Sequence, residues 1–158
     1  IVSGSLEDWN LQCNIVNIVI ELNKVYTVHV TRTKNSLKAK FELGSCERNN
    51  IGPVKFAGQQ KDLYLGSPFP KSQGESIYTS FHQFTPQLQA KCIPRNFQHI
   101  GKSKKLGTFC VPEEFSFKMN FYLTKHFSGW KSLVMFGNSR KEVNLLVEIK
   151  DGKWLYVF

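Results

Sequence analysis

The length and charge of the chain narrow the classes of protein to which it can belong. A chain of 158 residues is near the usual size of one domain and can bury a core without a structural metal. Its apolar residues, 41% of the total, occur in short runs that fall well below the roughly 20 residues of a membrane-spanning helix. The 21 Lys and Arg against 12 Asp and Glu give a net charge of +9. This charge favours a polyanionic partner (nucleic acid, sulfated glycan or anionic membrane) or a surface that is basic only for solubility.

The first half of the chain alternates β-branched and aromatic residues with polar ones, which predicts strands and not helices. The breaks between the first three runs are short and polar, as is typical of hairpins. We expect strands, in chain order, at residues 15–20, 25–31, 37–43, 53–57 and 62–66.

The alternation largely fails from about 67 to 106, which predicts a long irregular connection with only a brief apolar alternation around 77–84. It returns most clearly at 115–123, where every second residue is Phe, Met or Leu. Further strands are expected at 130–136, 143–149 and 154–158. Many short strands separated by turns are typical of an antiparallel β-sandwich or barrel, so we predict a single all-β domain over residues 1–158.

The cysteines predict disulfides and not a metal site. Cys13, Cys46, Cys92 and Cys110 form an even set without a C-x-x-C spacing or a cluster of histidines, which argues against zinc and against a thioredoxin-like motif. The local pairing joins Cys13 to Cys46 and Cys92 to Cys110, and the other two connectivities remain open. The alternative is four buried thiols in a reducing compartment.

The interval from Cys92 to Cys110 is the sharpest basic feature of the sequence, because it contains no acidic residue. A disulfide that closed it would hold several cations close together, where they could act jointly on an array of sulfates or phosphates. The alternative is a solvated loop. The expected polyanion-binding residues are Lys91, Arg95, His99, Lys102, Lys104 and Lys105.

No motif predicts catalysis, a metal or a cofactor. Glycan hydrolysis needs two carboxylates that converge on one cleft, whereas Glu113 and Glu114 are adjacent and would point to opposite faces of a strand. The four histidines lie far apart in the sequence, without an arrangement that resembles a triad. Among the aromatic residues, we expect Trp130 and Trp154 to pack in the core and Trp9 to be exposed.

Two segments of the chain resemble a known family. The run FSFKMNFYL, followed by GWKSLVMFGN and VNLLVEIKDGKWLYVF, resembles the opening half of a laminin G-like domain of the concanavalin A-like jelly-roll type. The earlier run VYTVHVTRTKNSLKAKFELG, with DLYLGSPFP, is similar to the closing half. Two motifs depart from the family: Val25-Tyr26 replaces the usual Trp-His, and the late G-C-I motif is missing unless Cys92 or Cys110 substitutes for it.

The resemblance implies a jelly-roll sandwich, and such domains frequently bind sulfated glycans and cell-surface receptors. They often bind calcium as well, but Asp8, Asp62 and Asp151 do not align with such a site. The closing half precedes the opening half, which leaves three explanations: a circular permutation, a cut through a tandem array, or coincidence. A further explanation, taken together with permutation, is that strands pair between two protomers, which would form a homodimer.

These observations predict a secreted, non-enzymatic adhesion module that binds heparin-like glycan or an acidic cell-surface receptor. The alternative is a secreted β-rich effector, toxin-like or cytokine-like, that binds a protein receptor through an apolar patch. Nucleic acid is disfavoured because the aromatic signature of an RNA-binding sheet is missing. No insertion into a membrane is expected.

Overall fold

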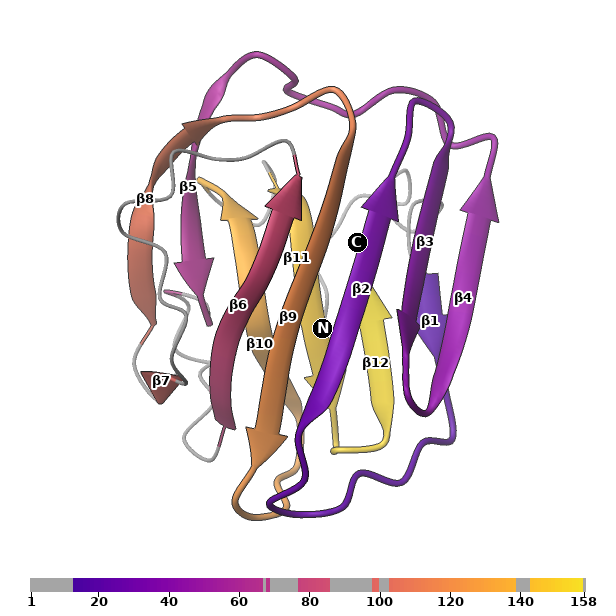
Figure 1. Cartoon of the computed structure of the whole chain (residues 1–158), viewed down its shortest axis with the longest axis vertical. Coiled ribbons are helices and arrows are strands. Elements are labelled where there is room, and N and C mark those ends of the chain that lie inside the picture. The colour runs from indigo at the N-terminus through magenta and orange to yellow at the C-terminus, as the bar shows by residue number, and fades with distance from the viewer. Residues whose placement is uncertain are drawn as a thin grey trace.

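The computed structural model describes residues 13–66, 68, 77–85, 98–99, 103–138 and 143–157. In these ranges the chain forms strands and no helix (Figure 1). The strands are β1 (Cys13–Ile15), β2 (Tyr26–Arg32), β3 (Ser36–Phe41), β4 (Gly44–Asn49), β5 (Gln60–Leu65), β6 (Ile77–Thr85), β7 (Gln98–His99), β8 (Lys104–Cys110), β9 (Phe115–Leu123), β10 (Trp130–Gly137), β11 (Val143–Lys150) and β12 (Trp154–Val157).

The strands form two antiparallel sheets of six strands each. Sheet A has the order β1-β12-β11-β10-β5-β8, and sheet B has the order β4-β3-β2-β9-β6-β7. Sheet B lies in front of sheet A in Figure 1, and the core lies between them. The predicted fold class, an antiparallel β-sandwich, is confirmed.

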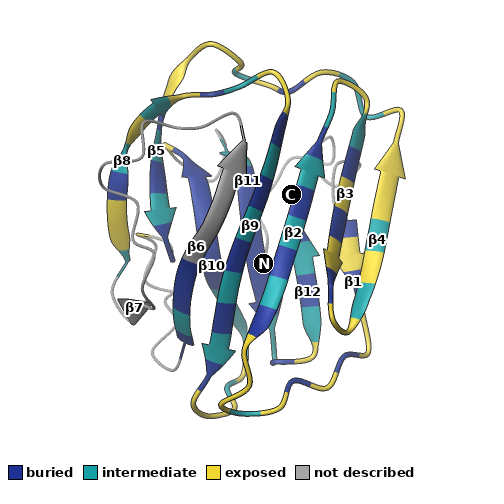
Figure 2. Cartoon of the chain, viewed as in Figure 1, coloured by how far each residue is buried: buried dark blue, intermediate teal, exposed yellow. Residues whose placement is uncertain are grey.

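Alternating side chains build this core. In β9, Phe117, Met119 and Phe121 are fully buried, while the residues between them are half-buried on the other face. Full burial of each such side chain contributes about 1.5–3 kcal/mol relative to exposure, so the period-two pattern fixes which face turns inward. Figure 2 shows the same alternation along β2 and β9 and a mostly exposed β4 at the edge.

Strands from both halves of the chain interleave in each sheet. In sheet B, β2 pairs with β9 in continuous register from Tyr26 opposite Phe121 to Arg32 opposite Phe115. In sheet A, β5 pairs with β10, with Tyr64 opposite Met135. Strands β2 and β5 of the first half and strands β9 and β10 of the second half therefore complete the same two sheets, and these edges are not left unpaired.

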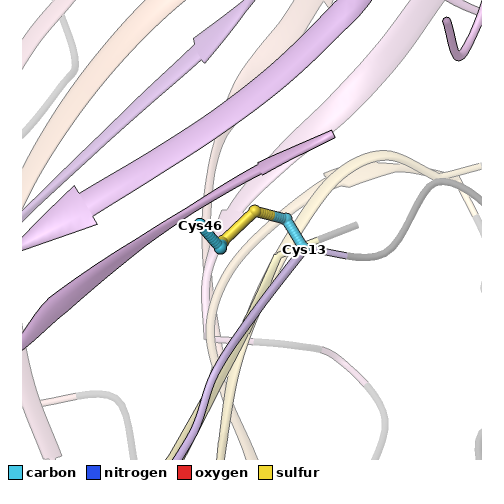
Figure 3. Close-up of a disulfide and its surroundings, with 2 residues drawn as sticks. All are labelled: Cys13 and Cys46. Atoms are coloured by element: carbon cyan, nitrogen blue, oxygen red, sulfur yellow. A yellow bond between two sulfur atoms is a disulfide. The ribbon is translucent and has the colours of Figure 1, made fainter. Parts of the chain in front are cut away.

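One disulfide joins the two sheets at their edges. Cys13 of β1 and Cys46 of β4 are bonded, with their Cα atoms 5.7 Å apart and a sequence separation of 33 (Figure 3). The first predicted pair is confirmed. The other prediction, a Cys92–Cys110 bond, is wrong for this structure: Cys110 at the end of edge strand β8 is an exposed free thiol, and Cys92 lies outside the described residues.

Several of the elements expected from the sequence need correction, and β4 was not expected at all. Residues 16–20 leave the strand after β1, because Asn17 adopts a positive φ of 57° that breaks the extended chain. Residues 53–57 form turns and not a strand, with Phe56 at a φ of 60°. The connection predicted as irregular from about 67 to 106 contains β6, β7 and the start of β8.

Candidate polyanion-binding site

The structure describes only part of the predicted basic segment. Lys91, Arg95 and Lys102 lie outside the described residues. His99 belongs to β7, where its backbone lies opposite Tyr78 of β6 at the edge of sheet B. The remaining two residues, Lys104 and Lys105, lie on β8 at the edge of sheet A. The three described residues of the predicted site therefore lie at the edges of two different sheets.

Lys105 forms a salt bridge with an acidic residue on the neighbouring strand. Its Nζ lies 3.2 Å from Oδ1 of Asp62, and the Thr108 hydroxyl donates a 2.7 Å hydrogen bond to the same oxygen. The hydrogen bond from Thr108, and then Lys105, lower the pKa of Asp62 against the opposing effect of burial. The carboxylate therefore stays ionised and offsets the charge of Lys105.

A second group of cations lies on the face of sheet B that turns away from sheet A, here called the outer face of sheet B. The register places Lys40 of β3 opposite His29 of β2, and His29 opposite Lys118 of β9. Lys40, His29 and Lys118 thus form a row across three strands, here called the lysine row. The row spans about 10 Å, because neighbouring strands are about 4.8 Å apart. Lys38 lies at the next outward position of β3, opposite Thr31.

His29 lies in the positive potential of the two neighbouring lysines. Its Nε2 lies 2.7 Å from the Ser116 hydroxyl, and either atom can donate, depending on the tautomer. Burial lowers the pKa of His29, and the charges of Lys118 and Lys40 lower it further. The lysine row thus carries its charge on Lys40 and Lys118 at neutral pH, while His29 is held neutral between them.

Acidic side chains lie at the border of the row. Glu42 accepts hydrogen bonds from the backbone N–H of Thr27 at 2.9 and 3.0 Å. Glu47 of β4 lies opposite Lys38 in the register. Both carboxylates therefore lie beside the lysines of β3.

Two tyrosines lie on the same outer face, farther along β9. Tyr122 of β9 and Tyr78 of β6 are in direct register, and their rings stack with centroids 4.9 Å apart and planes 2° from parallel. Asn120 lies between Tyr122 and Lys118 on this face and accepts a 2.7 Å hydrogen bond from the Thr27 hydroxyl. The outer face of β9 thus presents, in order, an aromatic ring, an amide and a cation.

The outer face of sheet A carries a different aromatic group, which corrects the prediction that its tryptophans are core residues. Trp130 and Trp154 are half-buried on this face, with the Nζ of Lys150 at 5.4 and 5.0 Å from their ring centroids. Trp130 also contacts Tyr156 at 4.6 Å between ring centroids. Since Leu155 and Val157 are the inward residues of β12, the alternation forces Trp154 outward.

The sequence alone does not reveal the lysine row, because its members are many residues apart in the chain. Lys38 and Lys40 alternate with core residues on β3, which is a local sign of a solvent-facing strand side. Lys118 comes about 80 residues later, in the middle of an otherwise apolar alternation. Only the pairing of β2 with β9 brings Lys40 and Lys118 together.

Within the described ranges, no three His, Cys, Asp or Glu side chains group as metal ligands would. The same part of the chain contains no helix of the length and apolarity needed to cross a membrane. Comparison of the chain with protein-family models, with curated proteins and with solved structures gives no match.

Proposed function

We propose that this chain is an extracellular, non-enzymatic binding module that recognises sulfated glycan or an acidic cell-surface receptor. The observation that carries the proposal is the lysine row across β3, β2 and β9, at the centre of the outer face of sheet B. This position replaces the predicted Cys92–Cys110 segment as the principal contact. Lys104 and Lys105 on β8 become secondary contacts.

The spacing of the lysine row suits a polyanion. Lys40 and Lys118 are about 10 Å apart, close to one Debye length at physiological ionic strength, so their potentials overlap. A ligand that carries several sulfates or carboxylates can contact both ammonium groups at once, whereas a single small anion contacts one. The net charge of +9 adds long-range attraction to this local contact.

The Cys13–Cys46 disulfide supports an extracellular location. Such bonds form and persist in oxidising compartments and are rare in the cytosol. The bond also joins the edges of the two sheets, so it belongs to the folded architecture.

The test compares retention on a heparin column between the wild type and the variant Lys38→Ala/Lys40→Ala/Lys118→Ala. A matched control removes the same charge from exposed lysines in connections away from the row: Lys55→Ala/Lys125→Ala/Lys153→Ala.

We expect the row variant to elute at markedly lower salt than both the wild type and the matched control. The reason is that a local array acts jointly, while dispersed lysines contribute only net charge. Equal elution of the two triple variants would overturn the proposed site, and elution of the wild type below physiological salt would overturn the glycan as ligand.

A receptor-binding effector is the second candidate, and exposed aliphatic side chains favour it. Val16, Val19 and Val25 are 55%, 78% and 48% exposed within and at the end of the β1–β2 connection, and Leu43 is 36% exposed in the β3–β4 turn. Salt distinguishes the two candidates, because apolar docking persists at high ionic strength while the polyanion contact weakens.

A further inference from the structure

Strand β4 ends sheet B, and β3 is its partner strand in the part of the chain that the structure describes. It lies at the right-hand edge of the sandwich in Figure 1 and is mostly exposed in Figure 2. The pairing with β3 and the disulfide from Cys46 to β1 hold it in an extended conformation. A strand that is already fixed loses little conformational entropy when another strand pairs with it.

The open side of β4 carries backbone groups that can bind a further strand. Opposite residues of an antiparallel pair alternate between pairs that exchange two hydrogen bonds and pairs that exchange none. The two-residue turn that joins Phe41 to its opposite residue, Gly44, makes these two a hydrogen-bonded pair. The N–H and C=O groups of Ser45 and Glu47 therefore point away from β3, and both residues are exposed.

From this edge and the lysine row we infer that a polyanion joins two copies of this chain into a dimer whose β4 strands pair antiparallel. The inference rests on the proposed function, because the lysine row of each copy binds the polyanion. Ser45 of one copy lies opposite Glu47 of the other, and the two such pairs exchange four backbone hydrogen bonds. This register avoids placing Glu47 opposite its own copy, which charge repulsion disfavours.

Pairing through β4 places both lysine rows on one continuous surface. The two-fold axis of an antiparallel pair is perpendicular to the sheet, so the outer faces of both copies point the same way. Three strand spacings, about 14 Å, separate Lys40 from its copy, and seven, about 34 Å, separate Lys118 from its copy. One extended polyanion can contact both rows, so each copy completes the binding surface of the other.

The polyanion is required because the free copies repel each other. Each carries a net charge of +9, which opposes association. Four backbone hydrogen bonds replace bonds to water, so they do not offset this repulsion and the entropy of association by themselves. A polyanion that spans both rows neutralises the charge and holds the two β4 strands close together.

The experiment measures the mass of the complexes by sedimentation velocity at physiological salt. The probes are a heparin disaccharide, too short to reach two rows, and a heparin dodecasaccharide, both in excess so that independently bound chains do not share one ligand. Glu47→Pro removes an N–H from the open side of β4 and leaves the bonds to β3 intact, as proline does at exposed sheet edges. Glu47→Ala is the matched control, because it loses the same charge and keeps the N–H.

We expect the wild type to sediment as one chain alone and with the disaccharide, and as two chains with the dodecasaccharide. Glu47→Ala should do the same, whereas Glu47→Pro should bind the dodecasaccharide and remain one chain. The inference is overturned if the wild type binds the dodecasaccharide as one chain, if it is already two chains without ligand, or if Glu47→Pro dimerises as readily as Glu47→Ala. Failure of the wild type to bind either saccharide would instead overturn the proposed function.

A near-ultraviolet circular dichroism spectrum and a thermal midpoint for each variant separate loss of the edge contact from loss of the fold. If Glu47→Pro unfolds, Ser45→Pro replaces it, because the N–H of Ser45 also points away from β3. Ser45→Ala is then the matched control, and the same outcomes apply.

Discussion

His29 occupies an unusual electrostatic position for a histidine on the surface of a sheet. It has a lysine opposite it on each neighbouring strand, Lys40 on β3 and Lys118 on β9, and its ring is bonded to the Ser116 hydroxyl. Two acidic residues, Glu42 and Glu47, lie beside the lysines of β3. The position keeps His29 neutral near pH 7 and adds a third positive charge to the row when the pH falls.

Heparin binding should depend on pH through His29. In the protein without ligand, burial and the two lysines lower the pKa of His29 below 6.5. A bound polyanion favours the protonated ring. Binding therefore takes up a proton, and affinity should rise as the pH falls below about 6.5. Titration calorimetry at pH 7.5 and 5.5 should show this rise in the wild type.

His29→Gln should flatten this dependence, and His126→Gln, which changes an exposed histidine in the β9–β10 connection, should preserve it. An equally steep rise in His29→Gln would contradict the assignment. The same pKa shift has a cost in stability: since the unfolded chain binds a proton at His29 more readily, the free energy of unfolding falls as the pH drops below about 6.5.

The Cys13–Cys46 bond is the feature that most directly links one sheet to the other at the scale of single elements. It joins β1, a strand of three residues, to edge strand β4. The close approach is also visible at Gly44, where an added Cβ would lie 2.7 Å from Cγ2 of Ile15. The short β1 is thus held by its pairing with β12, by one covalent bond and by the close approach of the Ile15 side chain to the backbone at Gly44.

The second prediction, at the scale of elements, is that Cys13→Ser/Cys46→Ser lowers the free energy of unfolding by about 3–4 kcal/mol, from the loop of 33 residues that the bond closes. Cys110→Ser removes an exposed thiol and should change it by less than about 0.5 kcal/mol. Urea titrations measure both. A double variant as stable as Cys110→Ser would show that the bond does not stabilise the fold.

The elements that could be predicted from the sequence are the ones with one face in the core. In β2 and β9 every second residue is buried, so the apolar alternation reports the strand directly. In contrast, β4 is exposed at most positions and has no such signal. The apolar run at 16–20 was wrongly predicted to be part of a strand, because Asn17 adopts a left-handed conformation that turns the chain.

Only the chemistry of the candidate site could be predicted from the sequence. Its geometry could not, because it depends on pairing between strands that are distant in the chain. A basic surface follows from the composition, whereas the local density of lysines directs attention to residues 91–105. Lys105, however, is paired with Asp62 across β5 and β8. The register of β2 with β3 and β9 then assembles Lys40, His29 and Lys118 from three separate segments.

At the scale of the whole molecule, the two sheets have different outer faces. The outer face of sheet B has lysines at its centre and a stacked tyrosine pair, whereas the outer face of sheet A has Lys150 beside two tryptophans and the Lys105–Asp62 pair. Both sheets are built from strands of both halves of the chain. The similarity to laminin G-like domains in reversed order stays a prediction, and this interleaving is the arrangement that a permuted domain requires.

The outer face of sheet B is proposed to carry the ligand, and nuclear magnetic resonance distinguishes this face from the opposite one. Titration of ¹⁵N-labelled protein with a heparin octasaccharide should shift the amide signals of β2, β3 and β9 around His29, Lys40 and Lys118. The indole N–H signals of Trp130 and Trp154, which report on the opposite face, should stay in place. Dominant shifts of those indoles, or of the amides of β8, would contradict the account.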